Sequence, residues 1–168
     1  MKNLAFLFLS LSISSLVFSS CKEQTKEADV LKVESSLEIF DIDSNSRTTI
    51  YKETSLFEAP NWSRDGEFLV FNGRGNLFTI PVVGGLPSLL NTGIAIKCNN
   101  DHGISPDNTT LVVSHHEEKS GKSMIYTLPI SGGEPTLITP NAPSYWHGWS
   151  PDGKTLAYCA ERNEAYDI

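Results

Sequence analysis

A short turn motif that occurs three times at nearly constant spacing constrains this chain more than any other feature. The copies lie at residues 61–66, 103–108 and 148–153 and read Asn-Trp-Ser-Arg-Asp-Gly, Gly-Ile-Ser-Pro-Asp-Asn and Gly-Trp-Ser-Pro-Asp-Gly. Their aspartates, Asp65, Asp107 and Asp152, are 42 and 45 residues apart. Each copy precedes an apolar run, at 68–71, 111–113 or 156–158. A turn that recurs at this period and leads into a strand predicts a repeat architecture.

The residues between the turns predict three further strands per repeat. The runs at 77–80 and 125–128 contain the β-branched and aromatic residues that favour strands. Gly-Gly turns follow at 84–85 and 132–133, and an outer strand is expected after each. The second repeat carries six extra residues, at 117–122, which predict a longer hairpin loop. Four short strands in 42 to 45 residues is the size of one propeller blade.

The repeated aspartates are predicted to form turns rather than to act in catalysis. In Ser-Pro-Asp-Gly the proline presets one backbone angle and the aspartate bonds back to the backbone, which suits a type I turn.

The repeat resembles the WD40-like β-propeller repeat of the TolB family. Residues 149–158 are similar to its turn and second strand, and residues 132–139 to its outer turn and strand. The resemblance spans residues 37–168 and implies an all-β partial propeller of four-stranded TolB-type blades. About three to four blades are represented, and propellers have four to eight blades. We therefore expect the chain to be the N-terminal part of a longer protein.

The first residues predict export and lipid attachment. Residues 1–20 have a basic start and an apolar, serine-containing stretch, as in a signal peptide. Residues 17–21 resemble the lipobox of bacterial lipoproteins, which implies lipid attachment at Cys21 and a bacterial envelope location, periplasmic or at the cell surface. The alternative is ordinary secretion without an anchor. Residues 21–36 are expected to form a flexible tether, because they are polar and poor in aromatics.

Charge and cysteine content exclude some functions. The net charge of −7 and the pI of about 5.0 argue against a nucleic-acid partner, which requires a basic face. Cys98 and Cys159 lie at different positions of their repeats, so we expect two small buried residues rather than a disulfide. No cofactor is predicted.

Two histidines are the strongest candidates for a binding site. His102 and His147 each lie three residues before the turn serine, in successive repeats. In the resembled repeat this stretch forms the innermost strand, which implies that both face a central channel. The candidate ligand-binding residues of that channel are Asn100, Asp101, His102, Tyr145, Trp146 and His147. Imidazoles there could hold a divalent metal, and the aromatic rings could stack on a sugar or a peptide. The alternative is that both histidines are structural hydrogen-bond donors.

Other motifs favour structural roles. His115 and His116 precede two glutamates, Glu117 and Glu118, at the predicted hairpin loop, so we expect a solvated hairpin. Trp62, Ile104 and Trp149 occupy one equivalent position and are expected to pack between blades. Residues 73–75 contain two glycines but lack the strand–helix context of a phosphate-binding loop.

The sequence therefore favours a non-enzymatic role. The expectation is an envelope-anchored propeller lipoprotein that binds protein or glycan partners and meets the membrane only through its lipid. One alternative is a metal-assisted carbohydrate lyase or hydrolase, because some oligogalacturonide lyases are similar in architecture and use channel histidines around a metal. Another is the propeller of a prolyl oligopeptidase-type serine peptidase, whose hydrolase domain would follow Ile168. The sequence leaves the partner and the oligomeric state open.

Overall fold

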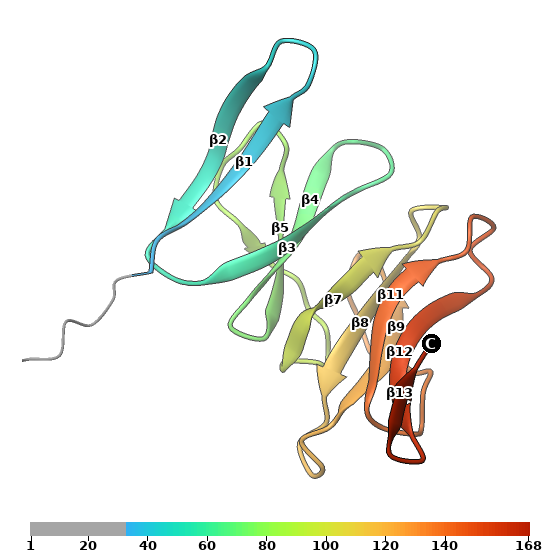
Figure 1. Ribbon diagram of the computed structural model, residues 1–168. Coiled ribbons are helices and arrows are strands. Elements are labelled where there is room, and N and C mark those ends of the chain that lie inside the picture. The colour runs from blue at the N-terminus through green and yellow to red at the C-terminus, as the bar shows by residue number, and fades with distance from the viewer. Residues whose placement is uncertain (1–32) are drawn as a thin grey trace, which may run out of the picture. The chain divides into compact units, whose positions relative to one another are not determined.

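A computed structural model describes residues 33–168 of the chain, and this part is all-β (Figure 1). It contains a two-stranded hairpin sheet, two four-stranded sheets and a three-stranded sheet, all antiparallel. The all-β prediction and the four-stranded blade are therefore confirmed. Within the described residues no helix is long and apolar enough to cross a membrane. The predicted signal peptide and Cys21 lie outside the described residues.

Each sheet follows the chain order, so neighbouring strands are joined by short turns. The hairpin sheet consists of β1 (Ser35–Asp41) and β2 (Ser46–Glu53). The first four-stranded sheet consists of β3 (Phe57–Trp62), β4 (Phe68–Gly73), β5 (Asn76–Pro81) and β6 (Ser88–Leu89). The second consists of β7 (Cys98–Ile104), β8 (Thr110–His116), β9 (Ser123–Pro129) and β10 (Thr136–Leu137). The three-stranded sheet consists of β11 (Ser144–Trp149), β12 (Leu156–Arg162) and β13 (Ala165–Asp167).

The predicted turns lie where the spacing placed them. The three motif copies connect the first and second strands of successive sheets, and residues 117–122 form the loop between β8 and β9. Arg74 and Gly75 both have positive φ and form the tight turn between β4 and β5. The two glycines of residues 73–75 therefore belong to a hairpin. β1 begins at Ser35, two residues before the expected start of the repeat region.

The core lies between successive sheets rather than within one sheet. Side chains of β4 and β5, such as Val70 and Leu77, pack against β7 to β9 of the next sheet. On its other face the first sheet buries Leu69 and Phe71 against Leu37 of the hairpin sheet. Because alternate residues of a strand point to opposite faces, each second strand contributes to two interfaces. The sheets therefore stack side by side, with β7 beside both β3 and β11 (Figure 1).

One position of the second strand ties each sheet to the next. The amide of Asn72 in β4 donates to the Cys98 carbonyl of β7 at 3.1 Å. The equivalent residue of β8 is Ser114, whose hydroxyl accepts from the Trp146 N–H of β11 at 2.9 Å. Each bond therefore joins the second strand of one sheet to the first strand of the following sheet. The equivalent residue of β12 is Cys159.

Two packing predictions need correction. Cys98 is buried as expected, but Cys159 is only half-buried; both are free thiols. Of the three equivalent residues expected between blades, Ile104 is buried in the core, whereas Trp62 is 46% exposed and Trp149 is half-buried. Trp62 is the last residue of β3, and the sheet that precedes β3 in the chain has only two strands.

Candidate functional site

The predicted site residues lie on the first strands β7 and β11, which are neighbours across two sheets. Both strands are interrupted by a register shift, between Cys98 and His102 in β7 and between Trp146 and Gly148 in β11. His102 pairs with Val113, whereas at the equivalent place in β11 it is Trp146 that pairs with Tyr158. A shift of one residue sends a side chain to the opposite face. The two histidines are equivalent in sequence but not in direction.

His102 is buried and does not face solvent. Its side chain is 2% exposed, and neither ring nitrogen has a hydrogen-bond partner among the described residues. Burial lowers the pKa of His102 to about 4, and nearby backbone carbonyls, including that of Val70, oppose the shift only weakly. The imidazole is therefore neutral at pH 7. The expectation that His102 faces an open channel is corrected to a packed position.

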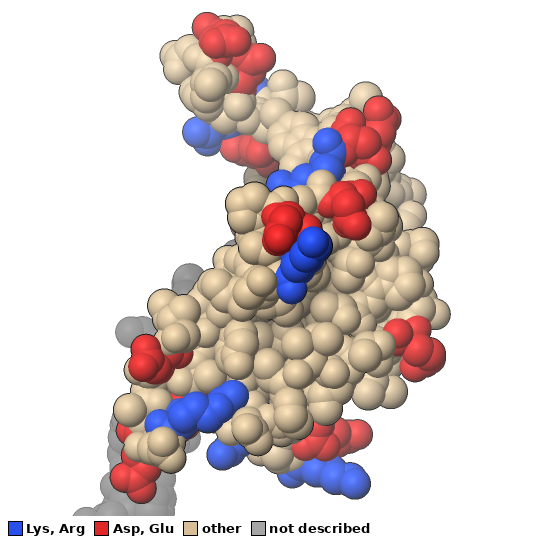
Figure 2. Space-filling model, turned by 90° about the vertical axis from the view of Figure 1, so that its right-hand side faces the viewer, with Lys and Arg blue, Asp and Glu red and all other residues tan. Residues whose placement is uncertain are grey.

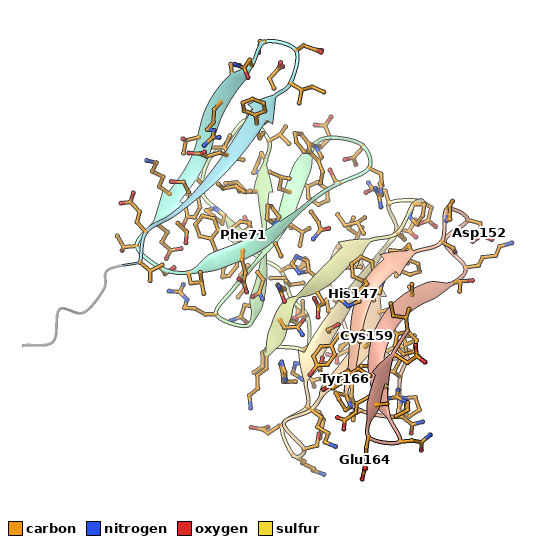
Figure 3. The ribbon with its side chains drawn as sticks, in the orientation of Figure 1. Phe71, His147, Asp152, Cys159, Glu164 and Tyr166 are labelled. Carbon is orange, nitrogen blue, oxygen red and sulfur yellow. The ribbon has the colours of Figure 1, made fainter. Side chains whose placement is uncertain are left out.

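His147 is exposed on β11 (Figure 3), close enough to the Asp101 carboxyl of β7 for its charge to act on that group. Desolvation raises the pKa of the half-buried Asp101 carboxyl, while the charges of His147 and His116 act in the opposite direction. The three side chains come from β7, β8 and β11. Asp101, His116 and His147, which we call the Asp101 cluster, offer a carboxylate that accepts hydrogen bonds and two imidazoles that can accept or donate them.

The other predicted site residues lie in two separate parts of the structure. Asn100 is exposed and Tyr145 half-buried, and both adjoin the Asp101 cluster in sequence. Trp146 instead packs on the preceding sheet, where a Cβ at Gly103 would meet its ring. The candidate set therefore comprises a polar group on the first strands and a tryptophan that packs between sheets.

The repeated aspartates hold their turns in one shared pattern. The Ser105 hydroxyl donates to the Asp107 carboxylate at 2.6 Å and accepts the Thr110 N–H at 2.9 Å. The same two bonds recur at Ser63 with Asp65 and at Ser150 with Asp152. The serine hydroxyl is the main reason that the pKa of each aspartate is lowered.

His115 and His116 are the last two residues of β8. His115 is buried, and its Nδ1 accepts the Lys97 N–H at 3.1 Å, which fixes the tautomer. His116 Nδ1 lies 3.1 Å from the Gly121 carbonyl. Glu117 accepts the Ser120 N–H within the β8–β9 loop, and Glu118 pairs with Lys97 in solvent. In residues 33–168 no three His, Cys, Asp or Glu side chains are placed to hold a metal ion.

Sequence reasoning missed a hollow of about 430 Å³ on the side of the turns. Its lining includes Arg64, Pro106 and Pro151, which precede the aspartate in the three motif copies, together with Trp146, Gly148 and Trp149. In the sequence, these three residues could have been recognised by their shared position, one residue before each aspartate.

Comparisons with known proteins identify the fold. No protein-family model matches the chain. It is 49% identical over 135 residues to a protein of Agrobacterium fabrum (strain C58) that carries the name uncharacterized protein Atu1656. The alignment covers 80% of this chain and 46% of that relative. The chain thus spans about half the length of the curated relative it matches.

Solved structures give the same result. A protein of Agrobacterium tumefaciens provisionally assigned as TolB is 48% identical, with a TM-score of 0.74, over 79% of this chain and 48% of that one. TolB of Acinetobacter baumannii is 18% identical, with a TM-score of 0.64, over 78% and 33%. The tricorn protease is 22% identical, with a TM-score of 0.55, over 74% and 13%. These last two show likeness of fold alone. The chain is structurally similar to the TolB-type propeller, as its repeats predict.

Proposed function

We propose that this chain is the propeller region of an envelope-anchored lipoprotein that binds a protein or glycan partner without transforming it. The Asp101 cluster carries the proposal, because the contacting strands β7, β8 and β11 bear its half-buried carboxylate, His116 and the exposed His147. Groups held on rigid strands lose little conformational freedom when a partner binds. The TolB-type fold supports a binding role by analogy only, since one fold serves many functions.

Binding at the Asp101 cluster is tested by loss of affinity. Immobilised protein is screened against glycan and peptide arrays, and the affinity of each hit is measured for wild type, Asp101→Asn and His147→Ala. We expect each substitution to weaken binding about tenfold, as for a lost hydrogen bond to a charged group. Asp43→Ala, an exposed carboxylate on the hairpin turn, is the control and should bind like wild type. Unchanged affinity in both cluster variants would contradict the proposal.

The anchor is tested independently. Cells expressing the chain are labelled with a palmitate analogue, and the wild type is expected to incorporate label while Cys21→Ser does not. Absence of label from the wild type removes lipid anchoring but leaves the binding role intact.

A metal-assisted lyase or hydrolase is distinguished by metal content. Among residues 33–168 the histidines do not form a metal-binding group, so we expect less than stoichiometric zinc, manganese or calcium after dialysis. Stoichiometric metal that is lost in His147→Ala would favour the enzyme instead.

A further inference from the structure

The hollow on the turn side has an unusual chemical lining. Its only side-chain polar groups are the indole N–H groups of Trp146 and Trp149 and the guanidinium of Arg64, all of which donate hydrogen bonds. Pro106, Pro151 and Gly148 complete the lining without polar side-chain atoms. A protein of net charge −7 thus has a hollow that carries a cation and no carboxylate.

Both indole N–H groups lack a partner. Trp146 Nε1 and Trp149 Nε1 are buried and make no hydrogen bond within residues 33–168. A buried donor without an acceptor costs about 1–3 kcal/mol in general, so two of them on one hollow require an explanation. An acceptor brought by a ligand would remove this cost.

Arg64 is held in place by the neighbouring sheet. Its Nη2 donates to the Ile104 carbonyl at 3.0 Å, and its Nε donates to the Ser105 carbonyl at 3.4 Å. Its backbone N–H donates to Asn108 at 2.9 Å. The guanidinium is therefore oriented in advance, and within the described residues Nη1 makes no hydrogen bond or ion pair. The nearby turn carboxylates are occupied, since Asp65 and Asp152 accept from their own turns.

The apolar part of the lining is flat. The outer atoms of the Trp146 ring lie against Gly103, so the preceding sheet fixes the position of the ring. On the other side Gly148 has nothing within 4 Å of where a Cβ would lie, which leaves room beside the rings. Indole and proline surfaces of this kind stack on flat apolar ligand faces.

We propose that this hollow binds a carboxylate attached to a flat apolar body, with the carboxylate at Arg64 and the body against Trp146 and Trp149. The site goes beyond the partner-binding role of the Asp101 cluster, with which it shares no residue. A carboxylate joined to an apolar face that can stack on indole is offered by the acid end of an aromatic peptide and by a sugar acid, whose C–H face is apolar.

Tryptophan fluorescence tests the proposal directly, because two of the three tryptophans line the hollow. The probes are N-acetylphenylalanine for the peptide-like source, D-glucuronate for the sugar source, and N-acetylphenylalanine amide as the uncharged control. We expect a saturable change with one carboxylate and none with the amide. Trp62→Phe, which removes the tryptophan outside the hollow, should keep the response.

Single substitutions test which side chains of the hollow bind the carboxylate ligand. Arg64→Gln should weaken binding about tenfold or more, whereas Arg47→Gln, an exposed arginine of the hairpin sheet, should not. Because Arg64 also contacts the next sheet, Trp149→Phe provides a second test, which keeps an aromatic side chain but removes the indole N–H and part of the stacking surface. No saturable change with either carboxylate at about 10 mM would overturn the proposal. Equal binding of the amide, or full affinity in both Arg64→Gln and Trp149→Phe, would also overturn it.

Discussion

At the scale of single residues, the two equivalent histidines behave differently because the backbone around them differs. His102 is packed without a hydrogen-bond partner, whereas His147 is exposed beside Asp101. The sequence places both at the same distance from the turn serine and predicts one role for both. It could not reveal the register shift, because a bulge depends on how two strands pair and has no fixed residue signature here.

The buried imidazole gives a pH dependence with a definite sign. The pKa of His102 is about 4 in the folded state and ordinarily about 6.5, so only the unfolded state binds a proton between these values. Stability is complete above pH 6.5 and falls by about 3 kcal/mol as the pH decreases to about 4. His115, whose pKa is also lowered, adds a contribution of the same sign.

Urea unfolding at pH 7 and pH 4.5 measures this effect. His102→Leu should reduce the loss of stability between these two pH values, and it leaves no polar group unpaired. The matched control is His147→Leu, which should retain the full dependence because that histidine is exposed. An equal loss of stability between pH 7 and pH 4.5 in the two variants would contradict the buried, neutral state of His102.

At the scale of elements, each turn is a small hydrogen-bonded unit that the sequence did predict. The motif fixes a serine and an aspartate two residues apart, and this pair forms the same bonds in all three copies. Strands are equally predictable, since alternation and turn spacing depend on local residues alone. Exposure of Trp62 was not predictable, because it depends on what the neighbouring sheet covers.

Removal of the turn hydroxyl should destabilise the second sheet. Ser105→Ala loses the bond to Asp107 and leaves the N–H of the half-buried Thr110 without its side-chain acceptor. We expect a loss of about 1–2 kcal/mol in the free energy of unfolding. Ser131→Ala, in an exposed turn, is the control and should cost no more than about 0.5 kcal/mol. Thermal unfolding monitored by circular dichroism measures both, and equal costs would refute the structural role of the hydroxyl.

At the scale of the whole molecule, successive sheets share one packing scheme. The same second-strand position links β4 to β7 and β8 to β11. Acidic and basic side chains occur on the surface in small separate groups with uncharged areas between them (Figure 2). The repeat period predicted the stacking of blades, but Arg64, Trp146 and Trp149 meet only in three dimensions. Sequence alone therefore predicts the repeated fold but not a site that side chains of several repeats form together.

The central claim is that consecutive sheets pack face to face as propeller blades, and the contact of Trp146 with Gly103 tests it most directly. The measurement is the free energy of unfolding of wild type, Gly103→Ala, Trp146→Ala and the double variant. A methyl group at Gly103 meets the indole ring, so Gly103→Ala should cost about 1–3 kcal/mol in wild type and far less when Trp146 is absent. Gly148→Ala, at the equivalent open position, should be nearly neutral. The same cost for Gly103→Ala with and without Trp146 would contradict the account.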